Sequence, residues 1–146
     1  MGNRRKSRES TLQILFQIEF DDSGPENILD QFWKGKKAQG EVKEYCRWLV
    51  MGIISNQDAL DRIIQSASEH WRLSRMPIVD RNILRMAVFE LFYGEDLAPA
   101  IVIDESLEIA KKFSSEQAAP FVNGILDALL RQQDKIKEKL KEDPNG

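Results

Sequence analysis

The segment Pro77–Tyr93 constrains the fold more than any other part of this sequence. Drawn as a helix at about 100° per residue, it carries apolar side chains almost all the way round and leaves no wide polar face. A helix of this kind must be surrounded by protein or lipid, and its charges and its length, below the roughly 20 apolar residues that a bilayer requires, exclude lipid. We therefore predict that it forms the centre of a soluble helical bundle, with Pro77 in its first turn.

Most of the remaining chain also has apolar residues at helical spacing, and no segment predicts a strand. Besides the central helix, the predicted helices span approximately residues 4–20, 26–34, 42–53, 55–71, 99–113 and 117–130. A charged helical tail is predicted over residues 131–142. The predicted fold class is all-α, with about seven helices in two small packed bundles. The expected halves are residues 1–73 and 74–146, divided near Ser74–Met76, and together they form one domain.

Several residues carry local predictions. Ser55 is expected to cap the helix that follows it, and Trp71 to lie on the inward stripe of that helix. Ser114 and Gln117 have the spacing of a capping box before the last core helix. Gly124 costs that helix about 1 kcal/mol relative to alanine, so we expect another helix to approach it closely.

The composition excludes a protein that is basic over its whole surface, since 146 residues carry a net charge of −3 and the pI is near 5.3. Positive charge nevertheless gathers at the start, in Arg4, Arg5, Lys6 and Arg8. Cations at a helix N-terminus oppose the macrodipole, so stability alone does not favour them there. Two interpretations follow: a solubilising terminus, or an arginine-rich arm that binds nucleic-acid phosphates.

The sequence offers little for catalysis. It has no phosphate-binding glycine loop, no nucleophile elbow and no paired cysteines, and His70 has no partner at metal-ligand spacing. Cys46 lies inside an apolar helical stripe, which favours a small core residue over a nucleophile. We expect a binding module rather than an enzyme, with no cofactor, no metal and no membrane segment. A single cysteine and the absence of a targeting signal indicate a cytoplasmic location.

Three blocks, taken together, resemble the NusB family of bacterial transcription antitermination factors. They are RRKSRESTLQILFQIEF, VDRNILRMAVFEL and IDESLEIAKKF…PFVNGILDALL. The resemblance covers Arg4 to Leu130 and implies a seven-helix fold in two bundles. It also implies binding of boxA RNA together with NusE, a small-subunit ribosomal protein. That complex would join elongating RNA polymerase with other Nus factors and support transcription of ribosomal RNA operons.

The resemblance also implies site residues. The RNA-binding residues would be Arg4, Arg5, Lys6, Arg8, Lys112, Phe113, Gln117 and Phe121. The surface that faces NusE would include Phe16, Phe20 and Asp80. Lys6 stands where an arginine is frequent, and it keeps the charge without the bidentate fork. Gln117 stands where some relatives carry an acid.

Some alternatives stay open at the level of sequence. Phe113 and Phe121 could stack on single-stranded bases or be core aromatics. Asp80 and Arg85 could form core salt bridges or contact a partner. The same helical domain precedes ribosomal RNA cytosine methyltransferases, so an RNA-binding accessory subunit for a separate methyltransferase is the alternative function. A structural protein that forms a homodimer is a further possibility.

Overall fold

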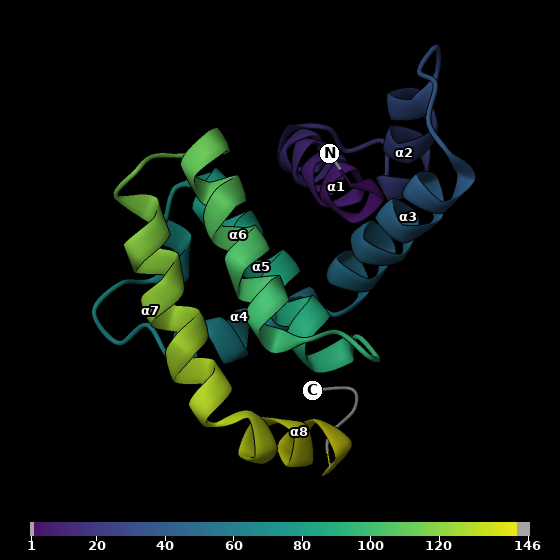
Figure 1. The fold of residues 1–146 in the computed structure, drawn as a ribbon. Helices are drawn as coiled ribbons and strands as arrows, with labels where there is room; N and C mark the ends of the chain where they lie inside the picture. The colour runs from purple at the N-terminus through teal and green to yellow at the C-terminus, as the bar shows by residue number, and fades with distance from the viewer. Residues whose placement is uncertain (1, 143–146) are drawn as a thin grey trace. The chain divides into compact units, whose positions relative to one another are not determined.

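The structure of the protein, a computed structural model, describes residues 2–142, and over these residues it contains helices and no strand (Figure 1). The elements are α1 (Asn3–Phe20), α2 (Pro25–Trp33), α3 (Gly40–Ser55), α4 (Gln57–Ser66), a 3₁₀ helix η1 (Leu73–Arg75), α5 (Ile78–Tyr93), α6 (Pro99–Phe113), α7 (Ala118–Arg131) and α8 (Gln133–Glu142). The all-α prediction is confirmed. One helix more than the expected seven arises because the charged tail forms the separate helix α8, after a turn at Gln132.

The chain forms two compact units, Met1–Ser55 with α1–α3 and Asn56–Gly146 with α4–α8. The sequence predicts a later boundary, between residues 73 and 74. Helix α4 packs against α5 and α7, so it belongs to the second unit. The first unit ends where α3 ends, at Ser55.

In the first unit, α1 packs against α3 and α2. Apolar side chains from all three helices meet in one cluster of buried residues: Ile14, Ile28, Leu29, Phe32, Cys46 and Val50. Cys46 is thus a core residue, as its place in the apolar stripe predicts.

In the second unit, α5 contacts α4, α6 and α7. Every side chain from Asn82 to Glu90 is buried, which confirms the prediction of a central helix. Figure 1 shows α6 and α7 side by side, with α5 behind α6. Pro77 lies just before the helix rather than in its first turn, because its ψ of 142° is extended.

The predicted roles of Ser55 and Trp71 are wrong. Ser55 is the last residue of α3, and α4 ends at Ser66. Beyond it, the Gln65 amide donates to the carbonyls of Ser68 (2.8 Å) and Trp71 (2.9 Å). These bonds close a loop in place of further helical turns, and the Trp71 side chain is left 59% exposed.

The expected close approach at Gly124 is also wrong. A Cβ atom built there would meet nothing within 4 Å, and the residue is exposed on α7. None of the described helices is long and apolar enough to cross a membrane.

Candidate nucleic-acid interface

The basic arm lies in the first two turns of α1, and it is held against α3. Asn3 donates to the side chains of Gln39 (3.0 Å) and Glu41. The Ser7 hydroxyl lies within hydrogen-bonding distance of the Asn3 carbonyl (3.1 Å) and the Val42 carbonyl (3.0 Å). Because these polar contacts fix the start of α1, the arm is an ordered part of the helix.

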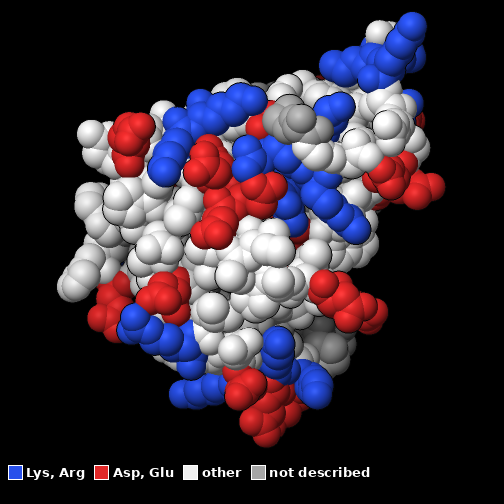
Figure 2. Space-filling model, in the orientation of Figure 1, with Lys and Arg blue, Asp and Glu red and all other residues white. Residues whose placement is uncertain are grey.

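The four basic residues of the arm differ in exposure. Arg4 and Lys6 are exposed and Arg5 is partly exposed, whereas Arg8 is only 3% exposed. Figure 2 shows Lys and Arg side chains gathered over α1 on one face of the molecule. The burial of Arg8 argues against the direct phosphate contact that the resemblance implied.

Arg4 brings two aromatic residues of α3 into the site. Its guanidinium carbon lies 3.6 Å from the centroid of the Tyr45 ring, a cation–π geometry. The Trp48 ring lies 5.2 Å from that of Tyr45 and is 37% exposed. A pocket of about 570 Å³ opens beside Arg4, Tyr45 and Trp48, and Glu41 and Glu44 also line it.

Tyr45 and Trp48 were absent from the residues predicted for the site. Their spacing of three residues on α3 predicts only that they share a helix face. The packing of α1 on α3 is what places Arg4 over that face.

The second group of predicted residues lies at the corner between α6 and α7. Lys112 is exposed, and its Nζ lies 5.3 Å from the centroid of the Phe113 ring. Phe113 and Phe121 are partly exposed, and Gln117 is exposed. The partial exposure of both phenyl rings permits stacking on a base and does not exclude a packing role.

The corner is fixed by two serines, and the predicted capping box is wrong. Ser114 donates to Asp80 Oδ1 at 2.5 Å, so it does not cap α7. The neighbouring Ser115 hydroxyl accepts the N–H of Ala118, the first residue of α7, at 3.1 Å.

Asp80 is 6% exposed and connects the first turn of α5 to the corner through Ser114. A side chain this buried makes a poor direct contact for a partner. Arg85 is also buried, and it forms a two-pronged ion pair with Asp61, with N–O distances of 2.7 and 3.0 Å. For Arg85 the structure therefore supports the core salt bridge.

Phe16 and Phe20, predicted to face a partner, lie on the surface of α1. They are 44% and 69% exposed, and their ring centroids are 5.2 Å apart. An exposed aromatic pair of this kind is typical of the centre of a protein–protein interface.

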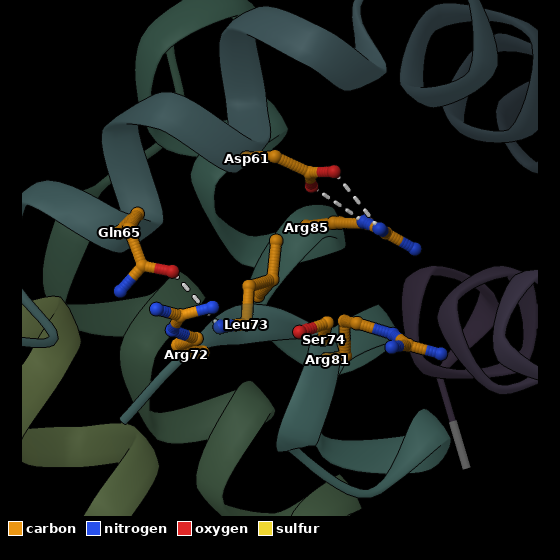
Figure 3. Close-up of a pocket in the computed structure, with 7 residues that line it drawn as sticks. All are labelled: Asp61, Gln65, Arg72, Leu73, Ser74, Arg81 and Arg85. Carbon is orange, nitrogen blue, oxygen red and sulfur yellow. Dashed lines mark hydrogen bonds and ion pairs between the residues drawn. The ribbon is translucent and has the colours of Figure 1, made fainter. Parts of the chain in front are cut away.

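The second unit contains a further pocket of about 620 Å³ that the sequence did not predict (Figure 3). Its lining residues are Asp61, Gln65, Arg72, Leu73, Ser74, Arg81 and Arg85. Within it, Asp61 faces Arg85, and Gln65 Oε1 accepts the Leu73 N–H at 2.9 Å. These bonds hold the segment that leads into α5, which indicates a structural role.

The predicted site residues thus form two groups, each in its own unit. The first unit holds Arg4, Arg5 and Lys6 beside Tyr45, with Phe16 and Phe20 further along α1. The second unit holds Lys112, Phe113, Gln117 and Phe121 at the corner, with Asp80 beneath it. Among the described residues, no cluster of three or more His, Cys, Asp or Glu side chains is placed to hold a metal ion.

Comparison with known proteins gives consistent matches along the chain. The model of the NusB family matches residues 5–131. A transcription antitermination protein NusB of Anaeromyxobacter dehalogenans is 42% identical over 127 residues, which are 86% of this chain and 89% of that protein. The corresponding protein of Sorangium cellulosum is 38% identical over 129 residues, 88% of this chain and 92% of that protein.

Solved structures agree. NusB of T. maritima superposes with a TM-score of 0.82 at 36% identity, over 90% of this chain and 92% of that one. A crystal structure of the antitermination factors NusB and NusE in complex with dsRNA contains a chain that matches with a TM-score of 0.80 at 26% identity. That match covers 90% of this chain and 98% of the other.

Proposed function

The chain belongs to the NusB family, and on this premise we propose that it is a transcription antitermination factor that binds boxA-type RNA together with NusE. Its relatives at 38% and 42% identity are transcription antitermination proteins, and a related NusB has been crystallised with NusE and dsRNA. The alternative, an accessory subunit for a methyltransferase, is not favoured by these relatives.

One observation carries the proposal: cations and partly exposed aromatic rings are paired at both predicted sites. Arg4 lies over Tyr45 beside Trp48, and Lys112 lies over Phe113. Arg and Lys neutralise phosphates without reading sequence, and aromatic rings stack on unpaired bases. This combination is typical of proteins that bind single-stranded RNA.

The NusE surface in this proposal is centred on Phe16 and Phe20. Both rings are exposed on the last turns of α1, where neither belongs to the buried cluster of the first unit. Asp80 is assigned a positioning role instead, because it reaches the corner through Ser114. With NusE bound, the complex joins elongating RNA polymerase and other Nus factors in the cytoplasm.

The net charge of −3 implies that this protein binds RNA weakly by itself. Long-range attraction to a polyanion requires positive charge, and here it is limited to local groups. NusE then contributes further contacts to the same RNA.

The test is a titration of labelled boxA RNA with this protein, alone and with saturating NusE. We expect tighter binding with NusE, and tighter binding to boxA than to a scrambled RNA of equal length. Size-exclusion chromatography of the same mixtures measures whether the free protein is a monomer or a homodimer. Equal RNA affinity with and without NusE would contradict the proposal.

A further inference from the structure

A groove of about 500 Å³ lies between α4 and α8, on elements that the proposed function does not use. Apolar side chains from both helices line its floor, and all four remain partly exposed. They are Ala59 and Ile63 from α4, and Ile136 and Leu140 from α8. Apolar side chains on two facing helices that stay accessible to solvent form a surface that a partner can cover.

Among the described residues, the groove is lined by cations and by no acid. Arg62 of α4 and Lys135 and Lys139 of α8 line it, and all three are exposed. Both helices also carry acids, but these lie outside the lining. On α8, Asp134 and Glu138 fall on the opposite side of the helix at 100° per residue.

Neither acid of α4 lines the groove. Asp61 is turned to the ion pair with Arg85, and Asp58 precedes Arg62 by one helical turn. The described lining is therefore cationic, although α8 as a whole has a mixture of signs. Figure 2 shows that mixture of basic and acidic side chains over α8, at the lower edge of the molecule.

The match to the family model ends at residue 131. Gln132 and the residues of α8 that line the groove lie just beyond that end. Five of the nine described lining residues therefore belong to a segment outside the family model. It also shares no lining residue with the arm or with the corner between α6 and α7.

We propose that the α4–α8 groove binds an acidic amphipathic helix of a partner protein. An apolar floor between two helices suits the apolar stripe of a third helix, and a cationic rim suits acids that flank that stripe. Helix α8 has 10 residues, which at 1.5 Å per residue gives a wall of about 15 Å, or nearly three helical turns. The described lining residues include no aromatic side chain on which a base could stack, which favours a polypeptide over RNA.

The probe is a fluorescein-labelled synthetic helix with leucines along one stripe and glutamates on both sides of it. A control peptide has the same composition in scrambled order. Binding to the full chain is measured by fluorescence anisotropy. We expect the patterned peptide to bind and the scrambled peptide to bind at least about tenfold more weakly, because only the first presents a continuous apolar stripe.

Two charge-reversal variants locate the site. Lys135→Glu with Lys139→Glu changes the groove side of α8, whereas Lys137→Glu with Lys141→Glu makes the same charge change on the other side. We expect the first pair to weaken peptide binding about tenfold and the second pair to leave it within about twofold. Circular dichroism checks that both variants keep their helix content. Arg62→Gln removes a groove cation from α4 and leaves α8 unchanged. It is also expected to weaken binding of the patterned peptide.

Three results would overturn the proposal. One is equal weakening by the two lysine pairs, and another is equal binding of the patterned and scrambled peptides. The third is displacement of the peptide by a single-stranded RNA whose own binding requires Lys135 and Lys139. RNA binding with NusE is measured on the same variants and is expected to stay unchanged, so this proposal and the proposed function can fail independently.

Discussion

At the scale of single residues, the contacts of Asp80 support the positioning role that we propose for it. It is buried, and its carboxylate accepts a 2.5 Å hydrogen bond from Ser114 at the turn between α6 and α7. A hydrogen bond to a charged group is worth roughly 1.5–3 kcal/mol. Asp80 therefore sets the position of the corner that carries Lys112 and Phe113.

This positioning role makes a prediction for Asp80→Ala and Ser114→Ala. Each substitution is expected to lower the free energy of unfolding by about 1–3 kcal/mol and to weaken RNA binding severalfold, because each frees the corner. In the double variant the two effects should be less than additive, as for two partners of one bond. Urea unfolding and RNA titration measure both effects.

A direct partner contact by Asp80 gives a different pattern. In that case Asp80→Ala would weaken NusE binding while Ser114→Ala would leave it unchanged. That result would contradict the positioning role.

Cys46 is a second residue whose environment decides its chemistry. Its side chain is fully buried, and Thr11 donates to its sulfur at 3.4 Å. Burial raises the pKa of the thiol from 9.0 to about 11, and the Thr11 hydrogen bond opposes this change. At neutral pH the thiol is protonated, so Cys46 is not a nucleophile.

The raised pKa predicts a loss of stability at alkaline pH. Between pH 9 and 11 the native state keeps a proton that the unfolded chain releases, so the free energy of unfolding falls as pH rises. The Cys46→Ala variant lacks this group and serves as the reference. Between pH 9 and pH 11, the free energy of unfolding of the unsubstituted protein should fall by on the order of 2 kcal/mol more than that of the variant. Urea unfolding of both proteins below pH 9 and near pH 11 measures the difference. A difference that does not change with pH would contradict the raised pKa.

At the scale of elements, α7 has a glycine on its exposed side, and no neighbouring residue is close enough to require a glycine there. Gly124 has open space around the position of a Cβ atom. Gly94, at the end of α5, is the opposite case: a Cβ there would lie 2.5 Å from the Glu90 carbonyl oxygen and 2.5 Å from Leu97 Cδ1.

The two glycines give a matched prediction. Gly124→Ala should raise the free energy of unfolding by about 0.4–1 kcal/mol, because alanine gives up less conformational freedom on folding and meets no obstacle. Gly94→Ala should lower it by about 1–3 kcal/mol, because the backbone must shift. Thermal or urea unfolding measures both. Destabilisation by Gly124→Ala would show that the surroundings of α7 are closer than the structure has them.

At the scale of the whole molecule, the proposed RNA contacts lie on two units. The arm belongs to Met1–Ser55 and the corner to Asn56–Gly146. If one RNA molecule binds both groups of residues, both units must contact the same RNA strand in the complex with NusE.

The arm predicts a particular salt dependence. Arg4→Ala with Arg5→Ala should reduce the slope of log affinity against log salt by about 0.7 for each phosphate that is no longer neutralised. Lys137→Ala with Lys141→Ala removes the same charge from α8 and is expected to leave the slope unchanged. RNA titration with NusE at several salt concentrations measures both slopes. An unchanged slope in the arginine variant would mean that the arm does not touch the backbone of the RNA.

The sequence by itself determined that the elements of this protein are helices, although it did not determine all of their ends. The all-round apolar pattern of Pro77–Tyr93 required a surrounded helix, and residues 82–90 are buried without exception. Hydrophobic periodicity and the clustering of basic residues are local properties, so the helices, the core position of Cys46 and the basic arm could be predicted without coordinates. The family resemblance then supplied the function and the candidate residues, which the periodicity could not.

Only the tertiary structure decided which side chains meet. It buried Arg8, directed Ser114 to Asp80 rather than to α7, placed Arg4 on Tyr45, and left Trp71 in a loop closed by Gln65. These outcomes depend on how helices and loops pack, and Ser114 and Asp80, for example, are 34 residues apart in the chain. Exposure and hydrogen-bond partners are properties of that packing, and a helical pattern read from one segment does not contain them.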